Sequence, residues 1–293
     1  MRPTTMLRKA LDQGEQIVAP GIYDPLSAKA VADLGFRGLS LSGFASSATL
    51  ATMEPVMTMT EQVELARRVA DVVDIPLVVD GHTGFGDAVH ITRAIREFER
   101  AQVAAIHLED EVFPKQVGYY KGRKHVVSIE AMQHRIAAAC EARQDNDFVI
   151  IARSDAASAG ASPDEVLERL AMYSEAGADV IMTLVSSLEE AKQVREAIPD
   201  KPLLWTAGLR HLDGDEVHVD VLKELGFQIV IYPLVGLVSA IDAVVTVYEA
   251  LMKNGVVDVA DFNAGYQRIM ELGGATFFSE IEERDPERVA RGS

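Results

Sequence analysis

The chain has 293 residues, of which 48% are hydrophobic and 25% charged, a balance typical of a globular protein long enough for one large domain. Its formal net charge of −17 excludes nucleic acid as a partner, because phosphate binding requires a basic face. The charge does not exclude an anionic ligand, since a bound cation can reverse the local field.

The composition also bears on the compartment. A single cysteine, Cys140, excludes an internal disulfide framework and fits a reducing environment. The first residues, Met1–Lys9, lack the apolar stretch of a signal peptide, and no segment approaches ~20 uninterrupted apolar residues. We therefore expect a cytoplasmic protein without a membrane partner.

Eight short apolar runs recur along the chain, and helical patterns separate them. Each run is 3 to 5 residues long and almost continuously hydrophobic, which is typical of a strand buried on both faces of a parallel sheet. In chain order the predicted strands are Gln16–Ala19, Gly38–Leu41, Leu77–Asp80, Ala105–Leu108, Phe148–Ala152, Val180–Leu184, Leu203–Trp205 and Gln228–Tyr232.

Amphipathic segments between these runs predict helices, most clearly over Thr60–Val73, Ala88–Ala101, Ser128–Arg143 and Ser162–Ala176. Two segments place a hydroxyl and a carboxylate three residues apart, which predicts capping boxes. They are Ser162–Glu165 and Ser187–Glu190. Glycines before strands two, six and eight are expected to end helices in the left-handed conformation. They are Gly35, Gly177 and Gly226.

Eight strands with crossovers close more naturally into an α/β barrel of the (β/α)₈ TIM type than into an open doubly wound sheet, which is the alternative. No low-complexity linker interrupts the pattern, so we expect a single domain over residues 1–293. Two further helices are predicted after the last strand, over Leu237–Lys253 and Val259–Leu272. The charged tail, Glu280–Ser293, is expected to be loosely held.

Charged residues stand at the ends of three neighbouring predicted strands. Asp80 ends the third strand, Glu109 follows the fourth and Arg153 follows the fifth. Functional groups of a TIM barrel lie at the carboxyl ends of its strands, so these side chains should converge, together with His82. Two carboxylates and a histidine favour a hard cation such as Mg²⁺ or Mn²⁺, and an arginine offers a fork for a substrate carboxylate.

Each of these residues also has a purely structural explanation. An aspartate at a strand end often caps the next helix, and Arg153 could form an ion pair with Asp155 at the barrel rim. Gly81, Gly84 and Gly86 could be turn residues, and their spacing does not match a dinucleotide fingerprint. The convergence of three charged strand ends is what favours a site.

Four segments of the chain carry ordered motifs. Asp80–Gly86 is similar to D-x-D-T-G-[FY]-G, and Leu108–Lys115 to I-E-D-x-x-x-P-K. Arg153–Ala156 is similar to R-[ST]-D-A, and Ile231–Leu234 to a final barrel strand. Together they resemble the isocitrate lyase/phosphoenolpyruvate mutase superfamily, from about Ala19 to Gly255. The resemblance implies a barrel enzyme that binds a 2-oxo or 2-hydroxy acid on Mg²⁺.

The resemblance also implies roles for individual residues. Asp80 matches a direct metal ligand, Glu109 a ligand that acts largely through water, and Glu54 a further acidic residue near the metal, while His82 stands where the family has a second carboxylate. Lys115 matches a lysine at the base of a mobile gating loop. The residues expected at the substrate are Ser42, Gly43, Phe44, Asp80, Arg153, Trp205 and Pro233.

It further implies a homotetramer, built as a dimer of dimers. The C-terminal helices, over residues 237–272, would be swapped between partners at the interface. The expected partner molecule is a small 2-oxo acid.

Departures from the family pattern bear on the reaction. Lyase members carry a K-[KR]-C-G-H loop whose cysteine is the general acid, but here Val117 stands at the cysteine position and Tyr119 at the histidine position. A family glutamate after strand six is replaced by Leu184, and a polar cluster after strand seven is reduced to Trp205–Ala207.

Without that cysteine, isocitrate-type cleavage lacks its proton donor, whereas decarboxylation expels neutral CO₂ and needs none. We therefore expect decarboxylation, or hydrolytic cleavage, of a 2-oxo dicarboxylate such as oxaloacetate. Lys115, Tyr119 and Arg153 are the expected catalytic residues, with Tyr119 or Tyr120 protonating the enolate. The alternatives are a phosphonopyruvate-type enzyme that acts on a P–C bond and a non-catalytic 2-oxo acid binder.

Overall fold

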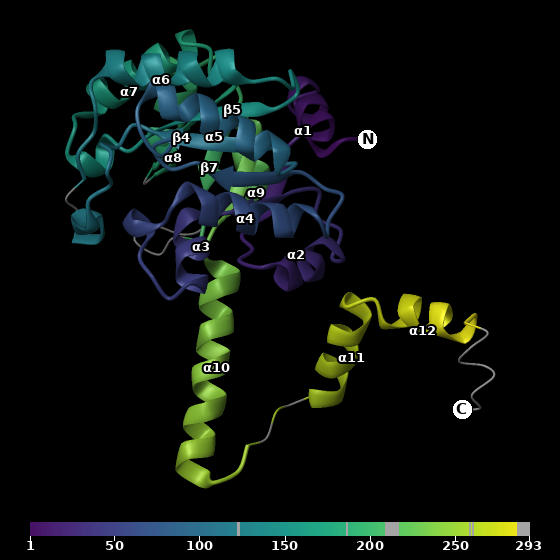
Figure 1. Cartoon of the computed structure of the whole chain (residues 1–293). Helices are drawn as coiled ribbons and strands as arrows, with labels where there is room; N and C mark the ends of the chain where they lie inside the picture. The colour runs from purple at the N-terminus through teal and green to yellow at the C-terminus, as the bar shows by residue number, and fades with distance from the viewer. Residues whose placement is uncertain (122–123, 186, 209–216, 258, 260, 286–293) are drawn as a thin grey trace. The chain divides into compact units, whose positions relative to one another are not determined.

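Eight parallel strands alternate with helices around a nearly closed barrel (Figure 1). The computed structural model describes residues 1–121, 124–185, 187–208, 217–257, 259 and 261–285. The strands are β1 (Ile17–Pro20), β2 (Leu39–Leu41), β3 (Leu77–Asp80), β4 (Ala105–Glu109), β5 (Val149–Ser154), β6 (Val180–Thr183), β7 (Leu203–Thr206) and β8 (Phe227–Tyr232). All eight lie at the positions expected from the sequence, with no end shifted by more than two residues.

The strand order excludes the doubly wound alternative. Each strand from β2 to β7 pairs in parallel with the next, and β1 pairs with β8, so the sheet turns back on its own beginning. A single parallel bridge between Gly21 and Ser40 joins the β1 and β2 edges. The fold is therefore the expected (β/α)₈ barrel of TIM type.

The helices of the barrel region are α1 (Pro3–Asp12), α2 (Pro25–Ala32), α3 (Gly43–Thr49), α4 (Met59–Ala70), α5 (Ala88–Arg100), α6 (Ile129–Ala142), α7 (Pro163–Glu175), α8 (Leu188–Ala197) and α9 (Val219–Glu224). Three short 3₁₀ helices are η1 (Glu54–Val56), η2 (Val117–Lys121) and η3 (Ala157–Ala159). The helices α1 and α3 were not predicted from the sequence.

Serines begin two of the helices as expected. The Ser162 and Ser187 hydroxyls accept the amides of Glu165 and Glu190, which is one half of a capping box at each helix. A complete box instead begins α4, where Thr58 and Glu61 satisfy each other's amides. The three predicted left-handed glycines are confirmed, with φ angles between +79° and +107°.

Side chains alternate in direction along each strand, so the hydrophobic core forms two clusters, one inside the barrel and one between the strands and the helices. Val78, Ile151 and Met182 point into the barrel, whereas the intervening residues pack outward against the helices. One end of the interior cluster is closed by Leu7 and Leu11 of α1. Because α1 precedes β1, it covers the amino ends of the strands and leaves the carboxyl ends for the site.

The chain divides into two compact units, Met1–Leu237 and Val238–Ser293. The first holds the entire barrel, and the second holds most of α10 (Val235–Asn254) together with α11 (Phe262–Leu272) and α12 (Ala275–Glu283). The charged tail expected to be loose is helical as far as Glu283. α10 has the length and apolar content of a membrane span, with a mean hydropathy of 1.7, although it carries Asp242 and Glu249.

Candidate active site

Four polar residues project from β3, β4 and β5 into the carboxyl end of the barrel. Val78, Ala105 and Ile151 belong to the interior cluster, so side chains two or four residues further along the same strands also face inward. These residues are Asp80, His107, Glu109 and Arg153, and the three acidic or imidazole side chains among them are buried. The expected convergence of Asp80, Glu109 and Arg153 is present, and the same alternation could have identified His107.

Asp80 lies at the centre of one group of these residues. Its Oδ1 accepts the His82 backbone amide at 2.9 Å, and its Oδ2 accepts the Gly43 amide at 3.2 Å. His107 Nδ1 lies 3.5 Å from Oδ1. Burial opposes ionisation, but the neighbouring His107, His82 and Arg153 hold the pKa of Asp80 well below its usual range. Asp80 is thus a fixed anion, not a cap for the following helix.

The His82 ring turns toward the site. Its Nδ1 lies 3.4 Å from Glu54 Oε1, and atoms of Glu54, Asp80 and His82 that could bind a metal lie within 4.8 Å of one another. The ring packs so closely on Gly43 that a Cβ there would collide with it. Burial favours the neutral ring, yet Asp80 and Glu54 raise the pKa of His82 above its ordinary value.

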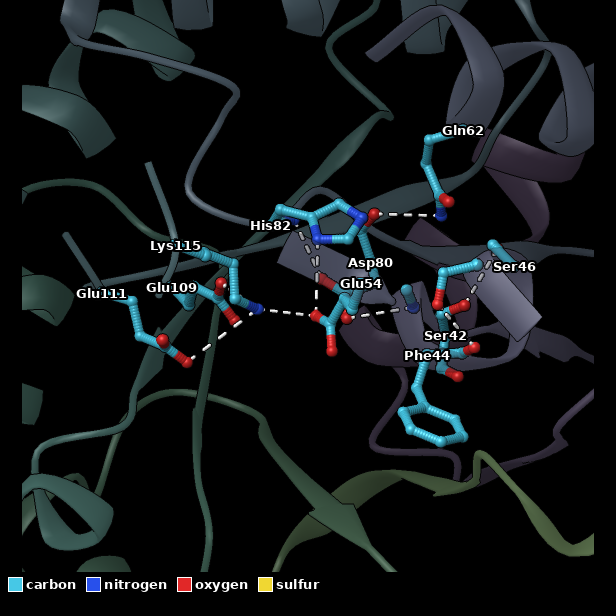
Figure 2. Close-up of polar contacts among 12 residues, drawn as sticks. Ser42, Phe44, Ser46, Glu54, Gln62, Asp80, His82, Glu109, Glu111 and Lys115 are labelled. Atoms are coloured by element: carbon cyan, nitrogen blue, oxygen red, sulfur yellow. Dashed lines mark hydrogen bonds and ion pairs between the residues drawn. The ribbon is translucent and has the colours of Figure 1, made fainter. Parts of the chain in front are cut away.

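Lys115 extends between carboxylates on two sides (Figure 2). Its Nζ lies 2.6 Å from Glu54 Oε1 and 2.7 Å from Glu109 Oε1. Burial opposes charge on Glu54, but Lys115 and His82 lower the pKa of this carboxyl to about 2. At Glu109 burial prevails over the attraction of Lys115 and Arg153 and raises the pKa to about 7. Glu54, which is distant in sequence, lies beside Asp80 and His82.

A second acidic group adjoins the first and was not assigned from the sequence. Oxygens of Glu109, Glu111 and Asp155 lie within 4.8 Å of one another. Lys124 bridges this group, with its Nζ 2.6 Å from Glu111 Oε1 and 3.1 Å from Asp155 Oδ2. Nothing in the spacing of Lys124 indicated this contact, because it depends on how the segment after β4 folds back.

Arg153 forms an ion pair at the barrel rim and also faces the acidic residues of the site. Its Nε and Nη2 both donate to Asp155 Oδ1, at 3.2 and 3.1 Å, which is the rim ion pair. Its Nη1 instead points to the acidic residues, 3.5 Å from Glu109 Oε2 and 3.8 Å from Asp80 Oδ2. Asp155 thus fixes the guanidinium plane and leaves the Nη1 edge for an anion.

A buried network behind the site holds Asp155 in place. The Asp110 carboxylate accepts the Asp155 amide, the Ser154 hydroxyl and the Tyr173 hydroxyl, each at 2.8 Å. Burial and the negative charge of Asp155 raise the pKa of Asp110 despite these donors. Asp110 faces outward from β4, so it supports the site from behind.

The other predicted substrate residues are distributed differently. Ser42 caps α3 by accepting the Ala45 amide at 3.0 Å, and Phe44 is 40% exposed. Trp205 does not join the site: it points outward from β7 and packs edge-on against Phe227, with ring centroids 5.2 Å apart. The outward direction follows from its position next to the inward-facing Leu204.

Pro233 and Tyr119 are the remaining predicted site residues. Pro233 follows β8, where its carbonyl lies against Gly21. Tyr119 belongs to η2, and its side chain, like that of Tyr120, lies outside the part of the chain that the structure describes.

The charge of the cluster fits one divalent cation. The buried carboxylates are those of Glu54, Asp80, Glu109, Glu111 and Asp155, and the cationic side chains among them are Lys115, Lys124 and Arg153. When all five carboxylates are ionised, which for Glu109 requires a pH above its raised pKa of about 7, and the histidines are neutral, the three cations leave a surplus of two negative charges. Carboxylate oxygens are also the donors that Mg²⁺ and Mn²⁺ prefer.

Known proteins share both the sequence and the fold. The family model for phosphoenolpyruvate phosphomutase matches residues 7–252. The 2,3-dimethylmalate lyase of Eubacterium barkeri is 36% identical over 289 residues, which cover 96% of this chain and 98% of that protein. A structure of oxaloacetate acetylhydrolase with the inhibitor 3,3-difluorooxalacetate has a TM-score of 0.88 at 30% identity and covers 97% of this chain and 98% of its own.

A structure of phosphonopyruvate hydrolase in complex with oxalate and Mg²⁺ has a TM-score of 0.84 at 32% identity, covering 97% of this chain and 99% of its own. The family match spans most of the barrel, and the relatives align over nearly their full lengths. The chain is therefore an enzyme that belongs to the isocitrate lyase/phosphoenolpyruvate mutase superfamily.

Proposed function

We propose that the protein is a Mg²⁺-dependent lyase that cleaves a carbon–carbon bond in a small 2-oxo or 2-hydroxy dicarboxylate, with oxaloacetate as the model substrate. The observation that carries the proposal is the buried pairing of an acidic cluster with the Nη1 edge of Arg153 at one barrel mouth. Such a mouth can hold a hard cation and a substrate carboxylate side by side.

The chain's own residues bind and orient the substrate in this proposal. Asp80, Glu54 and Glu109 would hold the cation, with His82 beside them. Arg153 would bind a substrate carboxylate through Nη1. When bound, a divalent cation supplies Lewis-acid stabilisation of the negative charge that develops on the 2-oxo oxygen, an effect worth several kcal/mol.

The placement of the thiol supports decarboxylation over isocitrate-type cleavage. Val117, at the position of the family's cysteine, is 48% exposed. The chain's one cysteine, Cys140, lies on α6, where its Sγ donates to the Gly177 carbonyl at 3.5 Å. No thiol can therefore protonate a departing carbanion, whereas CO₂ leaves as a neutral molecule.

A second candidate is P–C cleavage of a phosphonopyruvate-like acid. The likeness to phosphonopyruvate hydrolase favours it, since that structure holds oxalate and Mg²⁺ on the same fold. Oxalate resembles the planar enolate of a 2-oxo acid, so both candidates need the same cation and carboxylate contacts. The family membership argues against the third candidate, a non-catalytic binder.

Product analysis distinguishes these reactions. The protein would be incubated with oxaloacetate or phosphonopyruvate, with Mg²⁺ and with excess chelator. Decarboxylation gives pyruvate and CO₂, hydrolysis gives oxalate and acetate, and phosphonopyruvate cleavage gives pyruvate and phosphate. We expect chelator-sensitive turnover of oxaloacetate. No turnover of any 2-oxo acid in a panel, despite Mg²⁺ binding, would contradict the proposal.

The assembly and location are further parts of the proposal. We propose a cytoplasmic homotetramer, a dimer of dimers whose C-terminal helices over residues 237–272 lie at the interface and are swapped between partners. Apolar residues of α10 that are exposed in the single chain support an interface there.

A further inference from the structure

An ammonium group lies where the proposed metal ligands meet. Lys115 is only 6% exposed at its side chain, and its Nζ lies 2.6 Å from Glu54 Oε1 and 2.7 Å from Glu109 Oε1. Glu111 Oε1 is 3.9 Å away. Two of the three carboxylates proposed as ligands are thus already paired with one cation that belongs to the chain itself.

A divalent cation bound directly to Glu54 and Glu109 would compete with Lys115 for their carboxylates. Mg²⁺ binds carboxylate oxygen at about 2.1 Å, so an ion on Glu54 Oε1 or Glu109 Oε1 would lie within about 5 Å of Nζ. Glu109 offers no oxygen away from positive charge, because its Oε2 faces Arg153 Nη1 at 3.5 Å. Like charges at this distance repel strongly in a buried site.

We propose that Lys115 is a built-in counter-ion that competes with the divalent cation for Glu54 and Glu109, so that metal binding displaces its ammonium from these carboxylates. The inference rests on the metal site of the proposed function. It assigns to Lys115 control of metal affinity, in addition to the catalytic role expected from the sequence.

Lys124 provides the contrast. It is held equally firmly, 2.6 Å from Glu111 Oε1 and 3.1 Å from Asp155 Oδ2, and its side chain is 10% exposed. Neither partner is a proposed metal ligand. Metal binding should therefore leave Lys124 in place, which makes it an internal control of matching charge and burial.

The first test measures displacement directly in the whole protein. Lysines would be acylated under limiting reagent with and without Mg²⁺, after calorimetry has established saturation, and the modified sites would be quantified by mass spectrometry. The Lys115 side chain is only 6% exposed between its carboxylate partners, so displacement makes its amine more accessible to the reagent. We expect labelling of Lys115 to rise at least about threefold with Mg²⁺, while labelling of Lys124 and the exposed Lys192 stays constant.

The second test measures affinity. Mn²⁺ would be titrated into wild type, Lys115→Met and Lys124→Met by calorimetry. Removing the competing charge should tighten Mn²⁺ binding at least about tenfold in Lys115→Met, and much less in Lys124→Met. Because Lys115→Met leaves Glu54 and Glu109 facing each other, its Tm would be recorded with and without Mn²⁺. We expect a larger increase on adding Mn²⁺ than in wild type.

The outcomes separate this inference from the proposed function. Rising Lys115 labelling, or Mn²⁺ binding that is tighter in Lys115→Met alone, supports the competition. Mg²⁺ binding with unchanged Lys115 labelling and equal Mn²⁺ affinities overturns it and leaves the metal site intact. Failure of Mg²⁺ and Mn²⁺ to bind both wild type and Lys115→Met overturns the metal site and the inference together.

Discussion

Asp80 is held by two backbone amides, from Gly43 and His82, which orient both of its oxygens before any ligand arrives. An amide side chain at this position would lose the negative charge, and its single oxygen could accept only one of the two backbone N–H groups. We therefore expect Asp80→Asn to abolish Mg²⁺ binding and turnover, as excess EDTA should in wild type.

Calorimetry with Mn²⁺ and an oxaloacetate assay test this expectation. Asp164→Asn, an exposed change in the first turn of α7, is the control and should behave as wild type. Full activity of the wild-type protein after exhaustive chelation would rule out the metal mechanism.

A lysine should not be able to replace Arg153, because the site needs a guanidinium and not an ammonium. Lysine at this position could pair with Asp155 or approach the substrate, but it could not reproduce the fixed plane that presents Nη1 to the mouth. We expect Arg153→Lys to weaken binding of oxalate in the presence of Mg²⁺ by roughly 1.5–3 kcal/mol, the range for hydrogen bonds to charged groups. Calorimetry measures the loss, and wild-type affinity in the variant would show that Arg153 serves only the rim ion pair.

His82 should make metal affinity depend on pH. Its pKa is raised by Asp80 and Glu54, so the imidazolium persists above the ordinary value near 6.5. A proton on His82 and the metal ion are attracted by the same carboxylates, and the imidazolium repels the metal ion. Mg²⁺ affinity should therefore fall as the pH decreases through the raised pKa of His82 and be highest above that pKa. His82→Asp should bind Mg²⁺ more tightly and lose this part of the dependence. Titrations near pH 6 and pH 8 measure it, and parallel affinities in both proteins would place His82 outside the metal shell.

At the scale of elements, the sequence predicted what depends on local periodicity. Buried strands, their carboxyl ends and the residues that stand there follow from hydrophobic runs, so Asp80 and Glu109 were found. Inward or outward direction needs the register within a strand, which is why Trp205 was assigned to the site although it faces the helices. Lys124 depends on the fold of an irregular segment, for which no periodicity exists.

The helix α1 escaped prediction because it precedes the first strand and belongs to no βα repeat. Its Leu7 is fully buried among residues of the barrel interior, including Ile17 and Ile151. Leu7→Ala should therefore lower the free energy of unfolding by about 2–5 kcal/mol, as for other buried leucines. Mg²⁺ affinity should stay unchanged, because α1 closes the opposite end of the barrel from the site.

Chemical denaturation measures the loss at Leu7, and Mn²⁺ calorimetry measures the site. Leu26→Ala, at a leucine that is 45% exposed on α2, is the matched control and should change stability far less. An unfolding free energy equal to that of wild type in Leu7→Ala would show that α1 does not seal the barrel.

At the scale of the whole molecule, α10 presents two different faces. One carries exposed apolar side chains at alternating spacings of three and four residues: Val238, Ile241, Val245, Tyr248 and Met252. The other carries Asp242, Thr246, Glu249 and Lys253. An apolar stripe with this spacing is typical of a helix that packs against another protein surface, and the polar face explains how a helix with the composition of a membrane span can lie at such an interface.

The proposed tetramer places a second copy of the chain against this stripe. Ile241→Glu puts a charge in its centre, and a charge buried without a partner costs more than the ~1.5–3 kcal/mol gained by burying an isoleucine. Because a symmetric interface contains the change twice, we expect the variant to dissociate into smaller species at concentrations where wild type is tetrameric. Thr246→Glu adds the same charge on the polar face and should leave the assembly intact. Size-exclusion chromatography with light scattering measures both masses, and a monomeric wild type, or equal masses for the two variants, would refute an interface through this stripe.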